Sequence, residues 1–535
     1  MTTEEIADKI KLTGRLLELY GENPFKTRVY SNAAYSLDKA NPMLTGKTAE
    51  QIGAIEGVGK SIGVKVHELI TTGKLKELDE LLEKTPVGII EMLNIKGLGP
   101  KKVNQLWKEL EVENPGELLY ACKENRLVTL KGFGEKTQDS IIKSIEFMMA
   151  SHGKWHYYVV EDFAEQIVDY IKQKFETELV SVTGAVRRKD LIIETIEIVA
   201  AIEEDAFDPS EINNPMEIPV EILACDEADY FSALFHSSGS LAHMKQIETL
   251  KRTSMDESSE EKIYKAYGLD YIEPECREGN GEILLAQHHK LPKLIEVSDL
   301  KGNIHNHSSW SDGVNSLSEM ANACEKFGFE YFGICDHSKT AFYANGLQPD
   351  RVKKQQEEID KLNAKNKNFR IFKGIESDIL NDGSLDYEED ILKTFDFIVA
   401  SVHSVLKMDK DRATARLIKA IENPYTRVLG HPTGRLLLSR EGYPIDHKKV
   451  IDACAANNVA MELNAHPYRL DIDWKWIPYC MEKNVLISIN PDAHVIEGLL
   501  DVKWGTIAAR KGMLSKEFCL NAKSLSEFEK WITSK

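Results

Sequence analysis

The chain has 535 residues, 42% of them hydrophobic, and a formal net charge of −19. This length predicts several domains with hydrophobic cores, and no apolar run is long enough to cross a membrane. The N-terminus is charged and amphipathic, unlike a signal peptide, and the eight cysteines are scattered without a CxxC pair, as in proteins of a reducing compartment. We therefore expect a soluble, cytoplasmic protein, and a monomer, rather than a membrane or disulfide-rich secreted one.

The acidity of the whole chain argues at first sight against nucleic acid as a partner. It is unevenly distributed, however, because residues 1–150 carry 21 basic and 22 acidic side chains. A protein of this charge should bind DNA weakly and with a strong dependence on salt.

Three segments of the first 150 residues share a hydrophobic-x-Gly-hydrophobic-Gly pattern followed by a predicted helix: IEGVGKSIGVKVHELI, IKGLGPKKVNQLW and LKGFGEKTQDSIIKSI. The glycines permit a tight turn, and the helix that follows presents free N–H groups to a phosphate. These are helix-hairpin-helix signatures, which grip the DNA backbone without reading bases. The candidate DNA-binding residues are Gly57, Gly59, Lys60, Gly97, Gly99, Lys101, Gly132 and Gly134.

The segment NPFKTRVYSNAAYSL and the first hairpin resemble the lyase domain of family X DNA polymerases. The resemblance implies that a lysine after the hairpin attacks the sugar of an abasic site and forms a Schiff base, and the matching position is Lys65. A nucleophilic lysine needs its pKa lowered by desolvation or by neighbouring cations. A solvated lysine on a helix face is an equally open interpretation.

Residues 151 to about 290 continue this resemblance, and GAVRRKDLIIETIEIVAAIE resembles the palm motif. Residues i and i+2 of a strand share a face, which lets two carboxylates hold two Mg²⁺ ions. The positions of the three catalytic aspartates hold Thr195, Glu197 and Glu221. Thr195 removes one charge, and a carboxylate misplaced by about 1 Å can cost roughly a hundredfold in rate.

Other parts of the palm motif are kept, and the resemblance implies nucleotide contacts for Gly184, Arg187, Arg188, Ser238 and Gly239. We expect a preserved fold with a damaged nucleotidyl-transfer site. Binding of Mg²⁺ and dNTP there would require an active palm, which the sequence leaves open.

Nine metal-seeking side chains follow in the last 240 residues, most of them at the end of an apolar, strand-prone run. They are His305, His307, Asp312, His337, Glu376, His403, His431, Asp492 and His494. Helical, charge-rich stretches separate the runs, which is typical of a (βα) barrel with ligands at one end of its strands. Imidazoles and carboxylates together suit Mn, Zn or Fe ions, which can clamp a phosphodiester and activate water.

From about Lys293 onwards the chain resembles the PHP (polymerase and histidinol phosphatase) domain, a distorted (βα)₇ barrel with up to three divalent metals. The resemblance implies one metal on His305, His307, Glu376 and Asp492. It implies a second on His337, His403 and the shared Glu376, and a third on Asp312, His431 and His494. Arg435 and Arg469 would face the substrate phosphate; surface salt bridges are their alternative role.

The chain as a whole resembles a bacterial family X DNA polymerase with a C-terminal PHP domain. We expect a lyase-like helix-hairpin-helix domain at 1–80, a fingers-like one at 81–150, an α+β nucleotidyltransferase-like palm at 151–230, a thumb at 231–292 and the PHP barrel at 293–535. The predicted function is DNA repair on gapped, nicked or abasic DNA, with a 3′→5′ exonuclease, or a nuclease acting beside an abasic site, and a weak or lost polymerase. The alternatives are an active gap-filling polymerase with PHP proofreading, a phosphatase for a small metabolite, and a non-catalytic DNA-binding scaffold.

Overall fold

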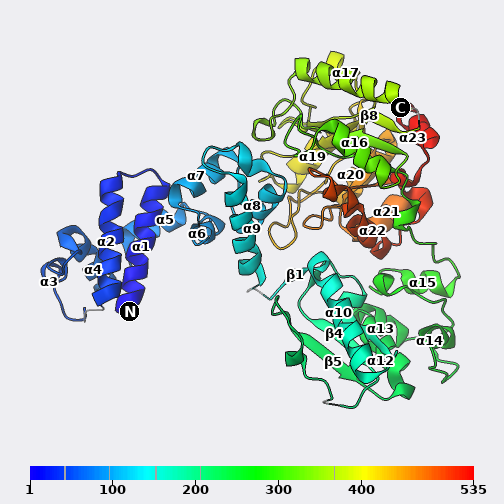
Figure 1. Cartoon of the computed structure of the whole chain (residues 1–535), viewed down its shortest axis with the longest axis horizontal. Coiled ribbons are helices and arrows are strands. Elements are labelled where there is room, and N and C mark those ends of the chain that lie inside the picture. Colours follow the sequence, from blue (N-terminus) through cyan, green and yellow to red (C-terminus); the bar gives the residue numbers. More distant parts are fainter. Residues whose placement is uncertain (41–43, 96, 151–152, 205, 367, 535) are drawn as a thin grey trace. The chain divides into compact units, whose positions relative to one another are not determined.

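The computed structural model describes residues 1–40, 44–95, 97–150, 153–204, 206–366 and 368–534 (Figure 1). The chain divides into two compact units, the first made of Met1–Lys123 and Leu127–Glu146, the second of Glu124–Arg126 and Phe147–Lys535. The expected boundary between residues 150 and 151 lies partly outside the described residues. Within the described part, no helix is long and apolar enough to span a membrane.

Helices build the described part of the first 150 residues. They are α1 (Thr3–Leu19), α2 (Pro24–Ala40), α3 (Ala49–Gly53), α4 (Gly59–Thr72), α5 (Lys76–Glu83), α6 (Val87–Leu93), α7 (Pro100–Glu109), α8 (Pro115–Lys123), the 3₁₀ turn η1 (Arg126–Thr129) and α9 (Glu135–Ala150).

The sequence explains where these helices begin and how they pack. Thr2 and Glu5 form a capping box at the start of α1, which satisfies backbone N–H groups that a helix end leaves open. Gly14 lets α1 and α2 approach closely, because a Cβ at this position would lie 2.7 Å from the Cβ of Tyr30.

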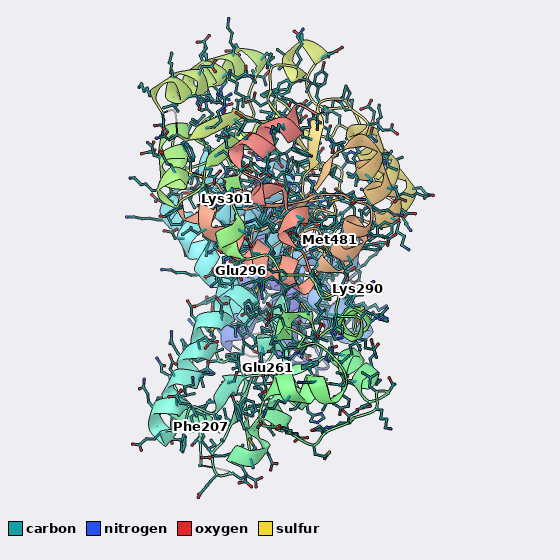
Figure 2. All side chains as sticks on the ribbon, turned by 90° about the vertical axis from the view of Figure 1, so that its right-hand side faces the viewer. Phe207, Glu261, Lys290, Glu296, Lys301 and Met481 are labelled. Atoms are coloured by element: carbon teal, nitrogen blue, oxygen red, sulfur yellow. The ribbon has the colours of Figure 1, made fainter. Side chains whose placement is uncertain are left out.

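The second unit has two lobes. Figure 2 shows Phe207 and Glu261 in one lobe and Lys301 and Met481 in the other, with Lys290 and Glu296 between them. The first lobe contains β1 (Trp155–His156), α10 (Tyr157–Phe175), β2 (Val180–Val182), α11 (Gly184–Arg187), β3 (Ile192–Ile193), β4 (Ile196–Ala200), η2 (Pro209–Glu211), β5 (Val220–Ala224), η3 (Glu227–Asp229), α12 (Tyr230–Ser238), α13 (Leu241–Ile247), α14 (Glu260–Ala266), η4 (Pro274–Cys276) and α15 (Glu282–Gln287).

A small sheet organises this lobe. Its strand order is β2-β4-β5, with β2 antiparallel and β5 parallel to β4. The apolar face of α10, including Val160 and Ile167, packs in one core with Ile198 of β4.

The second lobe alternates strands and helices. It contains η5 (Val297–Asp299), β6 (Gly302–Asn303), α16 (Leu317–Lys326), β7 (Tyr331–Ile334), η6 (Phe342–Ala344), α17 (Pro349–Lys365), β8 (Arg370–Lys373), β9 (Glu376–Asp378), α18 (Glu389–Leu392), β10 (Ile398–Ser401), α19 (Lys410–Ile421), β11 (Thr426–Leu429), α20 (His447–Asn457), β12 (Ala460–Asn464), η7 (Trp474–Trp476), α21 (Ile477–Glu482), β13 (Ile487–Asn490), η8 (Glu497–Asp501), α22 (Val502–Lys511), η9 (Lys516–Phe518), η10 (Leu520–Ala522) and α23 (Leu525–Ile532).

The strands of this lobe form two parallel sheets, in the orders β6-β7-β8 and β13-β12-β11-β10-β9. Isolated parallel bridges, His337 with Glu376 and Asn306 with Ala493, connect the two sheets. Because all strands run the same way, their carboxyl ends meet on one side, where the predicted ligands follow.

Candidate functional site

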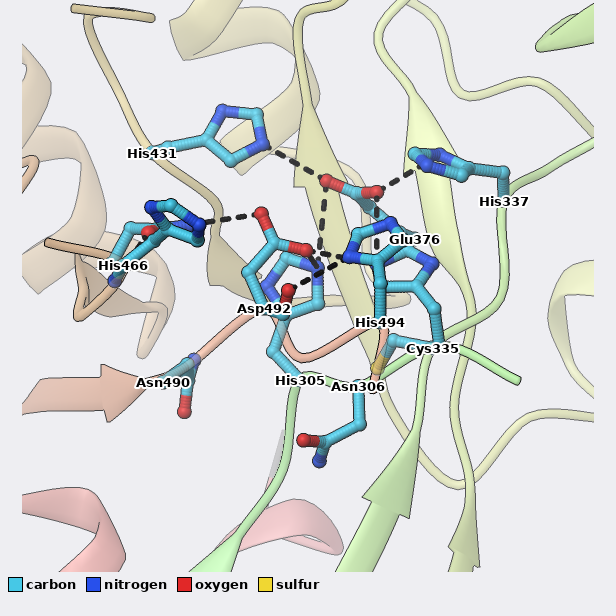
Figure 3. Close-up of polar contacts among 12 residues, drawn as sticks. His305, Asn306, Cys335, His337, Glu376, His431, His466, Asn490, Asp492 and His494 are labelled. Atoms are coloured by element: carbon cyan, nitrogen blue, oxygen red, sulfur yellow. Dashed lines mark hydrogen bonds and ion pairs between the residues drawn. The ribbon is translucent and has the colours of Figure 1, made fainter. Parts of the chain in front are cut away.

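The predicted ligands converge on one side of the two parallel sheets, and Figure 3 labels His305, His337, Glu376, His431, Asp492 and His494. His403 follows β10 by two residues, His431 follows β11 by two, and Glu376 is the first residue of β9. All nine side chains are at most 5% exposed.

Glu376 is the centre of the cluster. Its Oε1 lies 3.5 Å from His305 Nε2, 3.1 Å from His403 Nε2 and 3.0 Å from His431 Nε2. Its Oε2 lies 3.7 Å from His307 Nε2 and 3.0 Å from His337 Nδ1. One buried carboxylate therefore contacts five histidines.

Two further carboxylates complete the cluster. Asp492 Oδ1 lies 2.9 Å from His307 Nε2 and 3.6 Å from His305 Nε2. Asp312 contacts His337 Nε2 and His494 Nε2, both at 3.4 Å.

The contacts of His431 do not match the expected third metal set. That set joined His431 to Asp312 and His494, but the Nε2 of His431 contacts Glu376, next to His403. His337 takes the place beside Asp312 and His494 while also reaching Glu376.

The chemistry of the cluster fits divalent metals. Four groups of donors each lie within 4.8 Å of one another: His305, His307 and Asp492; His337, Glu376 and His403; His307, Asp312, His337 and His494; and Glu124, Asp492 and His494. Several buried ligand atoms also form no hydrogen bond, among them His305 Nε2, both ring nitrogens of His307 and of His337, Glu376 Oε2 and His494 Nε2. Buried polar atoms are rarely left without a hydrogen bond, so these atoms, which face oppositely charged groups across the cluster, suit an ion.

The electrostatics keep the carboxylates charged and two imidazoles neutral. Burial alone would raise the pKa of Glu376, but the charges of His403 and His337 hold that pKa well below its usual range. Burial lowers the pKa of His307 and of His431 to about 3, with a contribution from the positive charge of Arg469 at His431. A neutral imidazole offers the lone pair that a metal requires.

Three buried carboxylates support the ligands and were missed from the sequence. Glu462, in β12, accepts a hydrogen bond from His305 Nδ1 at 2.6 Å and another from the backbone N–H of His431. Asp378 accepts one from His403 Nδ1 at 2.5 Å. Asp336 accepts hydrogen bonds from the N–H and hydroxyl groups of Ser308 and Ser311, which shape the loop before Asp312.

Parts of the sequence pointed to these carboxylates. Asp378 follows Glu376 by two residues and so shares its face of the strand, and Asp336 directly precedes His337. Glu462 has no such neighbour, and only the pairing of β12 with β11 and β13 brings it to the site. Asn464, the last residue of β12, donates from its Nδ2 to Asp492 Oδ2 at 3.0 Å, and Figure 3 labels His466, which follows that strand.

The two predicted phosphate-binding arginines have different surroundings. Arg469 is 4% exposed and close enough to His431 to lower the pKa of that imidazole. Arg435 donates from Nη1 to Asp473 Oδ2 at 2.6 Å and from Nε to the backbone carbonyl of Arg469 at 3.1 Å. Arg435 therefore supports the segment that carries Arg469.

In the first lobe, the candidate polymerase residues lie at one end of the small sheet, where β4 and β5 begin. Glu197 of β4 is in register with Glu221 of the parallel neighbour β5, and Thr195 directly precedes β4. The Glu197 carboxylate lies against the Gly184 turn and accepts a hydrogen bond from the backbone N–H of Ala185 at 3.3 Å. A Cβ at Gly184 would lie 1.7 Å from Glu197 Oε2.

The cations of this turn are already paired. Arg187 forms a bidentate ion pair with Glu260, at 3.0 and 2.6 Å, and donates to the buried hydroxyl of Ser238. Arg188 contacts Asp190 at 2.9 Å and Glu278 at 3.5 Å. Gly239, the C-cap of α12, follows Ser238 in an extended conformation.

The three glycine-rich motifs all form turns that lead into helices. Gly57 and Gly59 precede or begin α4 with φ of 83° and 76°, and Lys60 is exposed in the first turn of that helix. Gly97 (φ 90°) and Gly99 precede α7, where Lys101 is exposed. Gly132 (φ 90°) and Gly134 precede α9.

Lys65, the candidate lyase nucleophile on α4, forms an ion pair with Glu77. Tyr30 donates to the same carboxylate oxygen at 2.5 Å, and Lys26 lies 3.8 Å from the other one. The Nζ of Lys65 is therefore engaged by a carboxylate, whereas a lyase nucleophile must be free to attack a sugar.

Comparison with known proteins agrees with these features. Residues 1–75 match a family model described as a helix-hairpin-helix domain, residues 89–146 a SAM-like helix-hairpin-helix tandem, and residues 303–466 the PHP domain. The chain is 33% identical over 574 aligned positions to "DNA polymerase/3'-5' exonuclease PolX" of Bacillus subtilis, which covers 99% of each chain. Proteins named "Probable phosphatase" from Caldicellulosiruptor bescii and Thermoanaerobacter sp. are 29% and 31% identical to 34% and 36% of this chain, covering 73% and 78% of their own lengths.

The fold and the site together define a multi-domain protein with helix-hairpin-helix motifs, a mixed α/β body and a PHP domain whose His, Asp and Glu cluster could bind metals. The similarity to the Bacillus subtilis protein extends over the whole chain. The chain belongs to the bacterial family X DNA polymerases that carry a C-terminal PHP domain, and the family predicted from the motifs is confirmed.

Proposed function

We propose that this protein is a DNA-repair nuclease that hydrolyses phosphoesters at DNA 3′ ends, acting as a 3′→5′ exonuclease through its PHP domain. The observation that carries this proposal is the single carboxylate of Glu376 in contact with five buried histidines. So many buried donors around one carboxylate are a poor fit to a merely structural core. Cleavage beside an abasic site would use the same centre.

The contacts support a division of the ligands into three sets. His305, His307 and Asp492 would share Glu376 in one set, and His403 and His431 would share it in a second. Asp312, His337 and His494 would form the third. Two or three Mn, Zn or Fe ions bound here would activate water and stabilise negative charge on the phosphoester.

The remaining residues of the centre would position the ligands and the substrate. Glu462 and Asp378 hold the Nδ1 atoms of His305 and His403, so that each Nε2 points to the cluster. Arg469 would bind the substrate phosphate, and Arg435 would hold Arg469 in place. The lobe that carries these residues would be the distorted PHP barrel of residues 293–535.

The three hairpins would hold gapped, nicked or abasic DNA by its backbone, since each turn presents N–H groups at a helix start. They would belong to the lyase-like and fingers-like domains at 1–80 and 81–150. A phosphatase for a small metabolite, the name printed for several relatives of the PHP domain, would need no such hairpins. The Lys65–Glu77 ion pair argues against a working lyase.

The palm at 151–230 and the thumb at 231–292 would be weak or silent as a polymerase. A triphosphate needs unpaired cations, but Arg187 and Arg188 are paired with Glu260, Asp190 and Glu278. Glu197 also places a negative charge against the Gly184 turn. The second candidate, an active gap-filling polymerase, is favoured by one observation, the register of Glu197 and Glu221 on adjacent strands.

Substitution of two ligands tests the proposal. His337→Ala and Asp492→Ala should each abolish Mn²⁺-dependent shortening of 5′-labelled single-stranded DNA and leave DNA affinity, measured by fluorescence anisotropy, close to that of the wild type. The matched control is His289→Ala, because this imidazole is 75% exposed and pairs with Asp270. Undiminished cleavage by either ligand variant would contradict the proposed mechanism.

A further inference from the structure

We propose that Phe342 and Val405 hold the base of the 3′-terminal nucleotide at the rim of the PHP cluster, so that the centre acts on an unpaired DNA end. This inference rests on the proposed function and adds that the DNA substrate is bound with its 3′-terminal base unpaired. It is carried by two exposed apolar side chains beside buried ligands.

Phe342 is 82% exposed, although the loop around it is well anchored. The loop follows His337, and the N–H of Leu347 returns to the carbonyl of His337 at 2.8 Å. Thr340, two residues before Phe342, donates from its backbone N–H to Asp386 at 2.7 Å and from its hydroxyl to Asp378 at 2.8 Å. The exposure of this aromatic ring is therefore a feature of a fixed loop.

Val405 lies in the loop that follows His403 and is 42% exposed. Its φ is 55°, in the left-handed region that β-branched residues rarely adopt. Strained backbone of this kind gathers at ligand-binding and catalytic loops.

One carboxylate ties the two loops together. Asp378 accepts hydrogen bonds from the Thr340 hydroxyl and from His403 Nδ1. Phe342 follows Thr340 by two residues, and Val405 follows His403 by two residues. Tyr343, next to Phe342, has its ring 6.0 Å from the ring of His337, which places this segment beside the cluster.

The chemistry of a nucleobase fits this rim. Every base has a flat π face, and aromatic side chains that stack on bases are the usual means of holding single strands without reading sequence. The terminal base of a duplex is held by its partner strand and by the base pair beneath it, and removing it from the stack costs energy, so the rim would select a frayed or single-stranded 3′ end. A small metabolite without a base would gain nothing from it.

The test compares two oligonucleotides with the same 3′-terminal phosphodiester, one ending in a normal nucleotide and one in an abasic tetrahydrofuran nucleotide. For the full-length protein with Mn²⁺, Phe342→Ala should lower kcat/KM on the normal end by about 5- to 100-fold, the range of one lost stacking contact. On the abasic end it should change kcat/KM little, and Phe342→Trp should restore cleavage of the normal end. The matched control is Phe327→Ala, because Phe327 is also exposed but caps α16, at the opposite end of β7 from the ligands.

An equal effect of Phe342→Ala on both ends, or no effect on either, would overturn the base contact while leaving the nuclease intact. Failure of the wild-type protein to cleave either end would instead overturn the proposed function. If the Trp variant does not recover the activity that the Ala variant loses, stacking is contradicted.

Discussion

Glu462 fixes the orientation of His305 through Nδ1 and does not contact the Nε2 atom that faces the cluster. Its Oε1 accepts from His305 Nδ1 and from Asn490 Nδ2, and its Oε2 accepts from the backbone N–H of His431. The proton of His305 is thereby held on Nδ1, which leaves Nε2 to face Asp492 and Glu376. Carboxylates in this position raise the basicity of a metal-binding imidazole and fix its tautomer.

Removal of this carboxylate should weaken metal binding. Glu462→Ala should lower the affinity of the metal-free protein for Mn²⁺ or Zn²⁺ by about 10- to 100-fold, as for other outer partners of metal-binding histidines. Glu462→Gln keeps one hydrogen-bond acceptor and should lose less. Calorimetric titration gives the affinities, and Glu482→Ala on the surface is the control, since its side chain is 66% exposed. An unchanged affinity in a folded Ala variant would contradict this role.

At this scale the sequence predicted the nine candidate ligands because most of them stand in a short polar motif beside an apolar run. It did not predict the pairing of His431 with Glu376, because side-chain distances depend on how strands far apart in the chain align. Glu462 was missed for the same reason, since a lone glutamate inside a strand has no local motif. The roles of all these residues stay predictions until they are tested.

At the scale of single elements, the two glycines of the second hairpin differ: the backbone of the turn requires one of them, whereas the other could carry a side chain without strain. Gly97 has φ of 90°, so any side chain there would strain the turn itself. Gly99, the N-cap of α7, has ordinary extended backbone (φ −84°, ψ 164°), and a Cβ added to it would meet nothing within 4 Å. Gly99 is therefore free to vary without strain unless DNA approaches it.

A branched side chain at position 99 should weaken DNA binding and leave the stability of the fold unchanged. Gly99→Val should weaken binding to all DNA sequences alike, by about tenfold, the equivalent of one charge-assisted hydrogen bond. Its thermal midpoint should equal that of the wild type, whereas Gly97→Val should lower the midpoint as well. Binding would be measured by anisotropy on several duplexes, and a loss confined to some of them would contradict backbone gripping.

The hairpin turns and most strands of the last domain could be predicted from the sequence, because glycine pairs and apolar runs determine the structure of only a few neighbouring residues. The strand β9 did not, since its residues Glu-Ser-Asp are polar and depend on pairing with β10. The small sheet of the first lobe was likewise predicted only in part. The register of Glu197 with Glu221 matches the expected neighbouring strands, whereas the contact of Glu197 with the Gly184 turn was not foreseen.

In the second unit as a whole, the PHP lobe and the first lobe are joined by α22. Ile507 packs in the core of the first lobe, and Lys511, whose side chain is 1% exposed, contacts Asp190 at 2.9 Å and Glu278 at 2.6 Å. Those two carboxylates also pair with Arg188. Arg188, from the turn that was expected to bind a nucleotide, is thus part of the contact between the two lobes. Lys511 and Asp190 lie about 320 residues apart in the sequence, so no local pattern could predict this link.

The most direct test of the whole account is one gel. The purified protein would be incubated with a 5′-labelled primer on gapped DNA, Mn²⁺ and all four dNTPs, and primer length would be followed. We predict shortening, because the PHP cluster holds its donors together, while Arg187 and Arg188 of the first lobe are paired and Glu197 lies against the Gly184 turn. Lengthening of the primer would contradict the account, since it would mean that Thr195, Glu197 and Glu221 still organise metals for synthesis.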